Sequence, residues 1–201
     1  LDVSNKFVSA GFIDAHIHNR LMGENNSFET VDHIGVLRGA TTVIECGSVA
    51  VVEIDNFIKE VQNEETRHYG LLSCLGEEGF TGKGASRDVE KMFTEHYKTA
   101  VDKADGLIVG LKVTASNSHT GDQGYALVKK AKDIAVELNL PLVVHVGNFP
   151  PDPNGIIEFM EAGDMITHAY HGKEISLFEA NGAPKKSIER ARRRGVYFDV
   201  G

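Results

Sequence analysis

Short apolar runs with the length of buried strands alternate with amphipathic helical runs along the whole chain, and this alternation limits the possible folds. It predicts a parallel sheet covered by helices, either an open doubly wound sheet or a barrel. Seven strands are expected, one fewer than a closed (β/α)8 TIM-type barrel has. The expected strands are residues 12–18, 41–46, 70–74, 107–113, 142–146, 165–168 and 196–200. The expected helices are residues 28–38, 52–65, 87–103, 125–138, 156–162 and 184–194.

Composition excludes several classes of protein. The 201 residues carry a formal net charge of −8, which argues against a general nucleic-acid binder. The basic run from Arg190 to Arg194 is typical of the exposed last turn of a helix. No apolar run approaches the roughly 20 residues needed to cross a membrane, so we expect no membrane partner. Two cysteines form no disulfide framework, so we expect a cytoplasmic protein.

Four of the expected strands carry a histidine or a lysine at or near their carboxyl ends. His16 and His18 alternate in "GFIDAHIH", Lys112 lies in "LIVGLKV", His145 in "LVVHV" and His168 in "DMITH". In parallel α/β folds these ends meet on one rim, where the functional site lies. A single buried histidine is more often a hydrogen-bonded core residue. Four of them on one rim, however, favour a site for zinc or a similar divalent ion.

Lys112 has two interpretations on residue chemistry alone. It lies between Leu111 and Val113 on an expected buried strand, where burial favours the neutral amine. A neutral amine reacts with carbon dioxide to form a carbamate, an anion whose two oxygens can bridge two cations. The alternative is an ion pair with a nearby carboxylate such as Asp14. Residue chemistry alone does not decide between these interpretations.

Other polar residues are weaker candidates. Glu45 and Cys46 end the second expected strand and are expected to line the wall of the site. His171, just past His168, is a candidate for contact with substrate, although a loop histidine is more often merely exposed. The loops 116–124 and 147–155 follow two of the strand ends and are candidates for substrate selection.

Four motifs together resemble a known family. "GFIDAHIH", "GLKV", "VVHVG" and "MITHAYHGK" resemble the metal-binding strands of the amidohydrolase superfamily. The likeness is strongest to its deacetylase-like, dihydroorotase-related branch, whose members are often labelled predicted amidohydrolase, adenine deaminase or dihydroorotase. By this resemblance, residues 1–10 look like the lead-in from a small β-sandwich domain that is otherwise largely absent. Residues 11–201 look like an incomplete metal-dependent hydrolase barrel covering about strands 1 to 7.

The resemblance implies a binuclear metal centre, usually of zinc. His16 and His18 would hold the more buried ion, and His145 and His168 the more exposed one. Lys112, carboxylated, would bridge the two. A water shared between the ions, deprotonated to hydroxide, would attack the carbonyl of an amide or ester in a small-molecule substrate. Which substrate, which metal and which oligomeric state apply cannot be predicted from the sequence.

One catalytic part of the family pattern has no counterpart here. The family takes its general base, an aspartate, from the end of the eighth strand, and this sequence ends after the seventh. Asp199 lies on the seventh strand and does not match that motif, so the role is not assigned to it. We therefore expect the chain alone to be inactive and prone to self-association, with a homo-oligomer as one outcome. The alternatives are a catalytically incomplete metal-binding fragment and a hydrolytic deaminase of a cyclic amidine.

Overall fold

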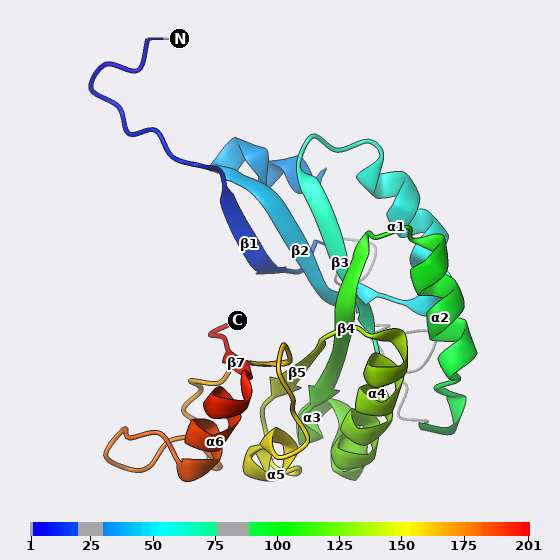
Figure 1. Ribbon diagram of the computed structural model, residues 1–201, viewed down its shortest axis with the longest axis vertical. Helices are drawn as coiled ribbons and strands as arrows, with labels where there is room; N and C mark the ends of the chain where they lie inside the picture. The colour runs from blue at the N-terminus through cyan, green and yellow to red at the C-terminus, as the bar shows by residue number, and fades with distance from the viewer. Residues whose placement is uncertain (1, 20–29, 76–88) are drawn as a thin grey trace.

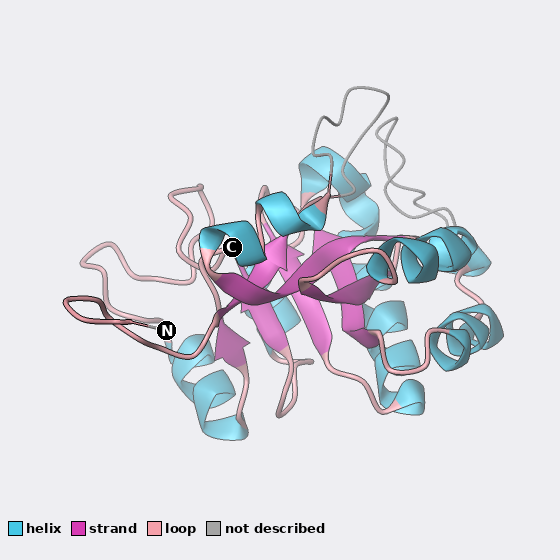
Figure 2. Ribbon diagram, turned by 90° about the horizontal axis from the view of Figure 1, so that it is seen from above, coloured by secondary structure: helices cyan, strands magenta, loops and turns pink. Residues whose placement is uncertain are grey.

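In the computed structural model, residues 2–19, 30–75 and 89–201 are described. Seven strands form one sheet, every neighbouring pair is parallel, and the spatial order follows the chain order. Figure 2 shows the sheet curled into an open half-barrel, as predicted. The strands are β1 (Phe12–Ile17), β2 (Ala40–Val49), β3 (Arg67–Ser73), β4 (Ile108–Ala115), β5 (Leu142–Val146), β6 (Met165–Thr167) and β7 (Tyr197–Phe198).

Helices connect the strands, and Figure 1 shows α1, α2 and α4 along one side of the sheet. The α-helices are α1 (Ile54–Val61), α2 (Thr94–Lys103), α3 (Asn117–Thr120), α4 (Gly124–Leu138), α5 (Pro153–Ile157) and α6 (Lys186–Arg194). Short 3-10 turns are η1 (Val31–His33), η2 (Val36–Arg38), η3 (Val51–Glu53), η4 (Val89–Lys91) and η5 (Gly121–Gln123). None of the described helices is both long enough and apolar enough to pass through a lipid bilayer.

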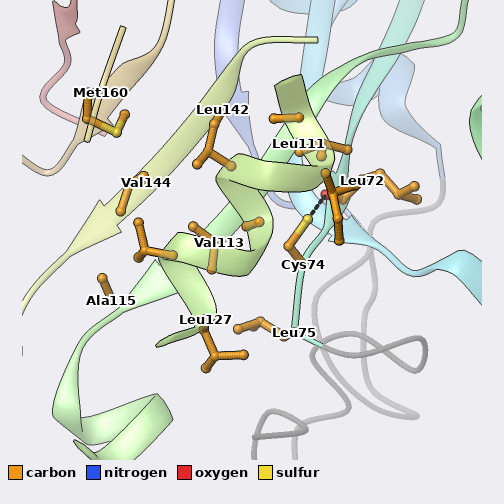
Figure 3. Packing of buried hydrophobic residues seen from close by; sticks show 14 of the residues in the cluster. Leu72, Cys74, Leu75, Leu111, Val113, Ala115, Leu127, Leu142, Val144 and Met160 are labelled. Carbon is orange, nitrogen blue, oxygen red and sulfur yellow. Dashed lines mark hydrogen bonds between the residues drawn. The ribbon is translucent and has the colours of Figure 1, made fainter. Parts of the chain in front are cut away.

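Helix α4 shows how the sequence pattern produces the layer outside the sheet. Leu127, Ala131 and Ile134 recur at helical spacing and are fully buried. The helix ends at Leu138 because Asn139 takes the left-handed conformation, with φ of 54°. Figure 3 shows Leu127 facing the buried side chains of β4 and β5. The predicted helix over residues 125–138 is therefore confirmed.

Three other helix predictions need correction. Residues 28 and 29 of the predicted helix 28–38 lie outside the described residues, and the rest forms two 3-10 turns instead of one helix. Gly35 separates the two turns with φ of −92° and ψ of −113°, and an added Cβ there would lie 2.3 Å from Thr66 Oγ1. The predicted helix 156–162 lies earlier in the chain, as α5 (Pro153–Ile157), and residues 158–162 are not helical. It begins early because Asp152 caps it by accepting the Asn154 N–H and Pro153 suits its first turn.

The predicted helix 87–103 begins later than expected. Residues 87 and 88 lie outside the described residues, Val89–Lys91 form a 3-10 turn, and α2 begins at Thr94. Residues 2–11 form neither helix nor strand, and Figure 1 shows them running away from the sheet. That they lead in from another domain stays a prediction. Both cysteines are buried and free, as expected for a chain without a disulfide framework.

Candidate active site

A cavity of about 200 Å³ lies at the carboxyl ends of the strands, where the sequence predicts a site. His18, Lys112, His145 and His168 all line it. His16 lies directly beside it, with its ring centroid 5.1 Å from that of His168. The other lining residues are Cys46, Gly47, Ser48, Ser73, Leu75, Thr114 and His119. The fold therefore brings the five predicted metal ligands together.

His16 and His18 face each other through their Nε2 atoms, which lie 3.2 Å apart. Each ring has a carboxylate near its other nitrogen: Asp199 Oδ2 is 3.4 Å from His16 Nδ1, and Glu45 Oε1 is 3.5 Å from His18 Nδ1. We assign the single proton of each neutral ring to Nδ1, facing its carboxylate. Two Nε2 lone pairs then point at one another, an arrangement that a cation between them would stabilise.

The distance between the two Nε2 atoms matches shared coordination. Two nitrogens bound to one tetrahedral zinc at Zn–N distances of about 2.0–2.1 Å lie about 3.3 Å apart. Burial and the nearby positive charge of Lys112 lower the pKa of His16 to about 4. At neutral pH the ring is therefore uncharged, which is the form that binds metal.

His145 and His168 form the opposite part of the rim. Their ring centroids lie 4.5 Å apart at 70°. Burial, with the charges of His168 and Lys112, lowers the pKa of His145 to about 2, and burial and Lys112 also lower that of His168. His168 adopts a left-handed backbone conformation with φ of 59°. Such conformations cost energy outside glycine and concentrate at functional sites.

Lys112 is 5 % exposed, and its ammonium contacts Cys46. Nζ lies 2.9 Å from Cys46 Sγ and 3.3 Å from the Cys46 carbonyl oxygen. Within the described part of the chain no carboxylate forms an ion pair with Lys112. Asp14 is exposed, and its Oδ1 accepts the backbone N–H of His16 at 3.1 Å. The interpretation of Lys112 as the ion-pair partner of Asp14 is therefore wrong.

Sequence comparison relates the chain to bacterial deacetylases, although no protein-family model matches it. It is 33% identical to a protein named deacetylase from Enterococcus faecalis, over 97% of this chain and 53% of that one. It is 29% identical to a deacetylase from Agrobacterium fabrum, over 100% of this chain and 50% of that one.

Two crystal structures share both fold and sequence. One, of an adenine deaminase, has a TM-score of 0.85 at 33% identity and covers 95% of this chain and 52% of that one. The other, of a dihydroorotase, has a TM-score of 0.84 at 28% identity and covers 98% of this chain and 52% of that one. These named relatives and structural neighbours fit the deacetylase- and dihydroorotase-like branch of the amidohydrolase superfamily, which this chain resembles. The chain spans about half the length of these relatives.

Within this chain, the roles of the site residues stay predictions. Among the described residues no three His, Cys, Asp or Glu side chains form a ready-made cation site. His171 is not among the cavity-lining residues. Its Nδ1 accepts the Lys173 N–H at 3.2 Å, and its buried Nε2 has no hydrogen-bond partner.

The sequence analysis missed three residues around the site, His119, Ser48 and Thr167, and it named Asp199 without assigning it a role. His119, on the short helix α3, lines the cavity with its ring centroid 5.6 Å from that of His145. Ser48 Oγ lies 3.2 Å from His18 Nδ1. Thr167 and Asp199 both approach His16 Nδ1. His119 carries a recognisable signal, a histidine in the loop after the Lys112 strand. The other three have none, because hydroxyls and carboxylates at strand ends are common.

Proposed function

We propose that this protein is a metal-dependent hydrolase that cleaves an amide or ester bond of a small molecule. The observation that carries the proposal is the convergence of His16, His18, Lys112, His145 and His168 at one cavity. The names of the relatives, deacetylase and dihydroorotase, support this reaction class. Two free, buried cysteines support a cytoplasmic location.

The donor set fits two divalent ions, zinc being the first choice for imidazole ligands. His16 and His18 would hold one ion and His145 and His168 the other. The anion that bridges them would be Lys112 as a carbamate. When bound, such ions supply Lewis acidity and make a water nucleophilic near neutral pH.

The chain's own residues prepare Lys112 for this change. Carbamate formation joins Nζ to the carbon of carbon dioxide and releases a proton from the nitrogen. It therefore requires an uncharged amine, and within the described part of the chain no carboxylate forms an ion pair with the Lys112 side chain. Gly47 leaves room beside the lysine stem, since a Cβ there would lie 2.4 Å from Lys112 Cγ. His145 and His168 line the same cavity, and burial lowers the pKa of both rings, which favours their uncharged forms.

A hydrolytic deaminase of a cyclic amidine is the second candidate. The structural match to an adenine deaminase at 33% identity favours it. A buried lysine that has no acidic partner among the described residues favours the amide or ester hydrolase, because that lysine is suited to carboxylation. The two reactions release different products, so detection of ammonia against a free carboxylic acid distinguishes them.

Substitution of Lys112 tests the metal centre. We expect the wild-type protein to contain up to two zinc ions by elemental analysis. Lys112→Arg and Lys112→Ala should both lose the paired ions, because neither side chain can form the carbamate. Adding propionate with zinc should restore metal in Lys112→Ala, which leaves space, but not in Lys112→Arg, which fills it.

The control for this experiment is His33→Ala, an exposed histidine in a 3-10 turn away from the cavity. It should retain the wild-type metal content. Hydrolysis of acetylated small molecules by full-length protein should follow the metal content of each variant. Wild-type metal content in Lys112→Arg would contradict the bridging role, and wild-type protein free of metal without exposure to chelators would contradict the proposed function.

A further inference from the structure

Asp199 and Thr167 contact Nδ1 of His16, on the edge of the ring opposite the Nε2 atom that faces His18. Thr167 Oγ1 lies 3.0 Å from His16 Nδ1, and Asp199 Oδ2 lies 3.4 Å from the same atom. Thr167 Oγ1 in turn donates to Asp199 Oδ2 at 3.0 Å. Three side chains from β1, β6 and the segment after β7 therefore form one closed hydrogen-bonded group.

Counting protons in this group determines the tautomer of His16. A carboxylate can only accept hydrogen bonds, and the single hydroxyl proton of Thr167 is donated to it. Both neighbours of His16 Nδ1 therefore offer acceptor oxygens to it. A neutral imidazole carries one proton, which must lie on Nδ1 to satisfy them. The Nε2 atom is left with a free lone pair directed at His18 Nε2.

The backbone around Asp199 holds the carboxylate in this place. Asp199 N donates to the Ile166 carbonyl at 2.9 Å, and the Asp199 carbonyl accepts the Ala169 N–H at 3.0 Å. Inside a barrel of this type, side chains from alternate strands share a layer. His16 lies on β1 and Asp199 directly follows β7, and both line a second cavity of about 150 Å³ inside the half-barrel. Their contact is therefore compatible with another strand between β1 and β7.

We propose that Asp199, assisted by Thr167, is a positioning residue of the metal site that fixes the His16 tautomer able to bind metal through Nε2. This inference rests on the proposed function, because it assigns a role toward the ion that His16 and His18 would hold. It gives Asp199 a task different from that of the family's general base. Carboxylate partners of ligating histidines typically change metal affinity by about 10- to 100-fold when removed.

Three variants test the role of Asp199 and Thr167. Asp199→Ala should weaken zinc binding about 10- to 100-fold, measured by competition with a chromophoric chelator. Asp199→Asn should recover most of the loss, because the amide oxygen still accepts from Nδ1. Thr167→Val should have a smaller effect than Asp199→Ala, since the carboxylate remains. Asp133→Ala, which removes an exposed carboxylate on α4, is the matched control and should bind zinc as the wild type does.

Long-range proton–nitrogen NMR of the metal-free protein supplies a measurement that does not depend on zinc. The wild type and Asp199→Asn should show His16 protonated on Nδ1, whereas Asp199→Ala should shift the proton toward Nε2. Circular dichroism melting tests whether each variant is folded. If Asp199→Ala does not fold, Thr167→Val replaces it in the zinc-binding and NMR measurements.

Two results would overturn the inference. The first is a zinc affinity of Asp199→Ala within about twofold of the wild-type affinity, because removing such a partner is expected to cause a much larger loss. The second is an unchanged His16 tautomer in Asp199→Ala. Absence of zinc from the wild-type protein would instead contradict the proposed function. The NMR comparison would then still show whether Asp199 sets the tautomer.

Discussion

Gly47 lies against Lys112 so closely that no side chain fits between them. Its φ of 92° is in the left-handed region, and an added Cβ would lie 2.4 Å from Lys112 Cγ and 2.7 Å from Lys112 Cβ. Glycine is therefore required here for two separate reasons, the backbone conformation and the space. The lysine stem, and with it the place of the proposed carbamate, depends on this position.

Gly47→Ala should separate these two effects. We expect a loss of about 1–2 kcal/mol from the left-handed backbone and about 1–3 kcal/mol more from overpacking against Lys112. Zinc content should fall as Lys112 is displaced. Gly182→Ala is the matched control, because Gly182 has φ of 82° but nothing within 4 Å of an added Cβ.

Urea unfolding and elemental analysis of both glycine variants measure these effects. Gly182→Ala should show the backbone cost alone and keep its metal. Equal losses of stability in the two variants, with zinc retained in Gly47→Ala, would show that Lys112 does not depend on this contact.

Asp164 joins three elements at the end of the sheet opposite the cavity. It is 2 % exposed and accepts hydrogen bonds from Leu142 N at 2.9 Å, Glu161 N at 2.8 Å and Lys132 Nζ at 2.6 Å. These bonds tie the start of β5, the turn before β6 and helix α4 to one carboxylate. The amino-terminal end of a barrel serves stability, while its carboxyl-terminal end carries chemistry.

Asp164→Ala should therefore cost stability without affecting the metal site. Removing the carboxylate leaves two backbone N–H groups without their acceptor and takes away one of the two acidic partners of Lys132, whose Nζ still lies 3.0 Å from Glu161 Oε2. We expect a loss of about 3 kcal/mol in urea unfolding. Zinc bound per folded molecule should stay at the wild-type value. Asp133→Ala, an exposed carboxylate on α4, should change stability by no more than about 0.5 kcal/mol. Loss of zinc in folded Asp164→Ala would show that the two ends of the sheet are coupled.

The sheet as a whole has two edge strands, β1 and β7, that do not pair with one another. Both edges carry exposed apolar side chains, among them Ile13 at 68 % and Tyr197 at 62 % exposure. An edge with unpaired backbone groups and apolar side chains is a template for association. His16 and Asp199 contact each other across the opening, but a side-chain contact does not satisfy the backbone of either edge.

The 201-residue chain expressed alone should self-associate at increasing concentration. Static light scattering should report a mass above that of one chain. Ile13→Lys places a charge on the β1 edge and should reduce association, whereas Val136→Lys places the same charge on the exposed face of α4 and should not. A single monomeric species of wild-type chain at all concentrations would show that the edges are protected in another way.

The strand and helix order could be read from the sequence because it follows from local patterns. Leu142–Val146 is a β-branched apolar run, and Leu127, Ala131 and Ile134 repeat at helical spacing. Those patterns report burial, which is the main determinant of secondary structure in a packed layer. Helix ends were harder to predict. Between the two turns, Gly35 lies so close to Thr66 that an added Cβ would be 2.3 Å from Thr66 Oγ1, and local propensity contains no information about this contact between distant positions.

The candidate site likewise has features that could be predicted from the sequence and features that could not. The imidazoles and the lysine that reach one rim could be predicted from the sequence, because the carboxyl ends of parallel strands must meet there. Tertiary structure alone decided that Lys112 contacts Cys46 rather than Asp14, and that Asp199 reaches His16 across 183 positions. Such contacts depend on how far the sheet curls, and curl arises from the summed twist and packing of all seven strands. No local sequence pattern predicts this combined twist and packing of the whole sheet.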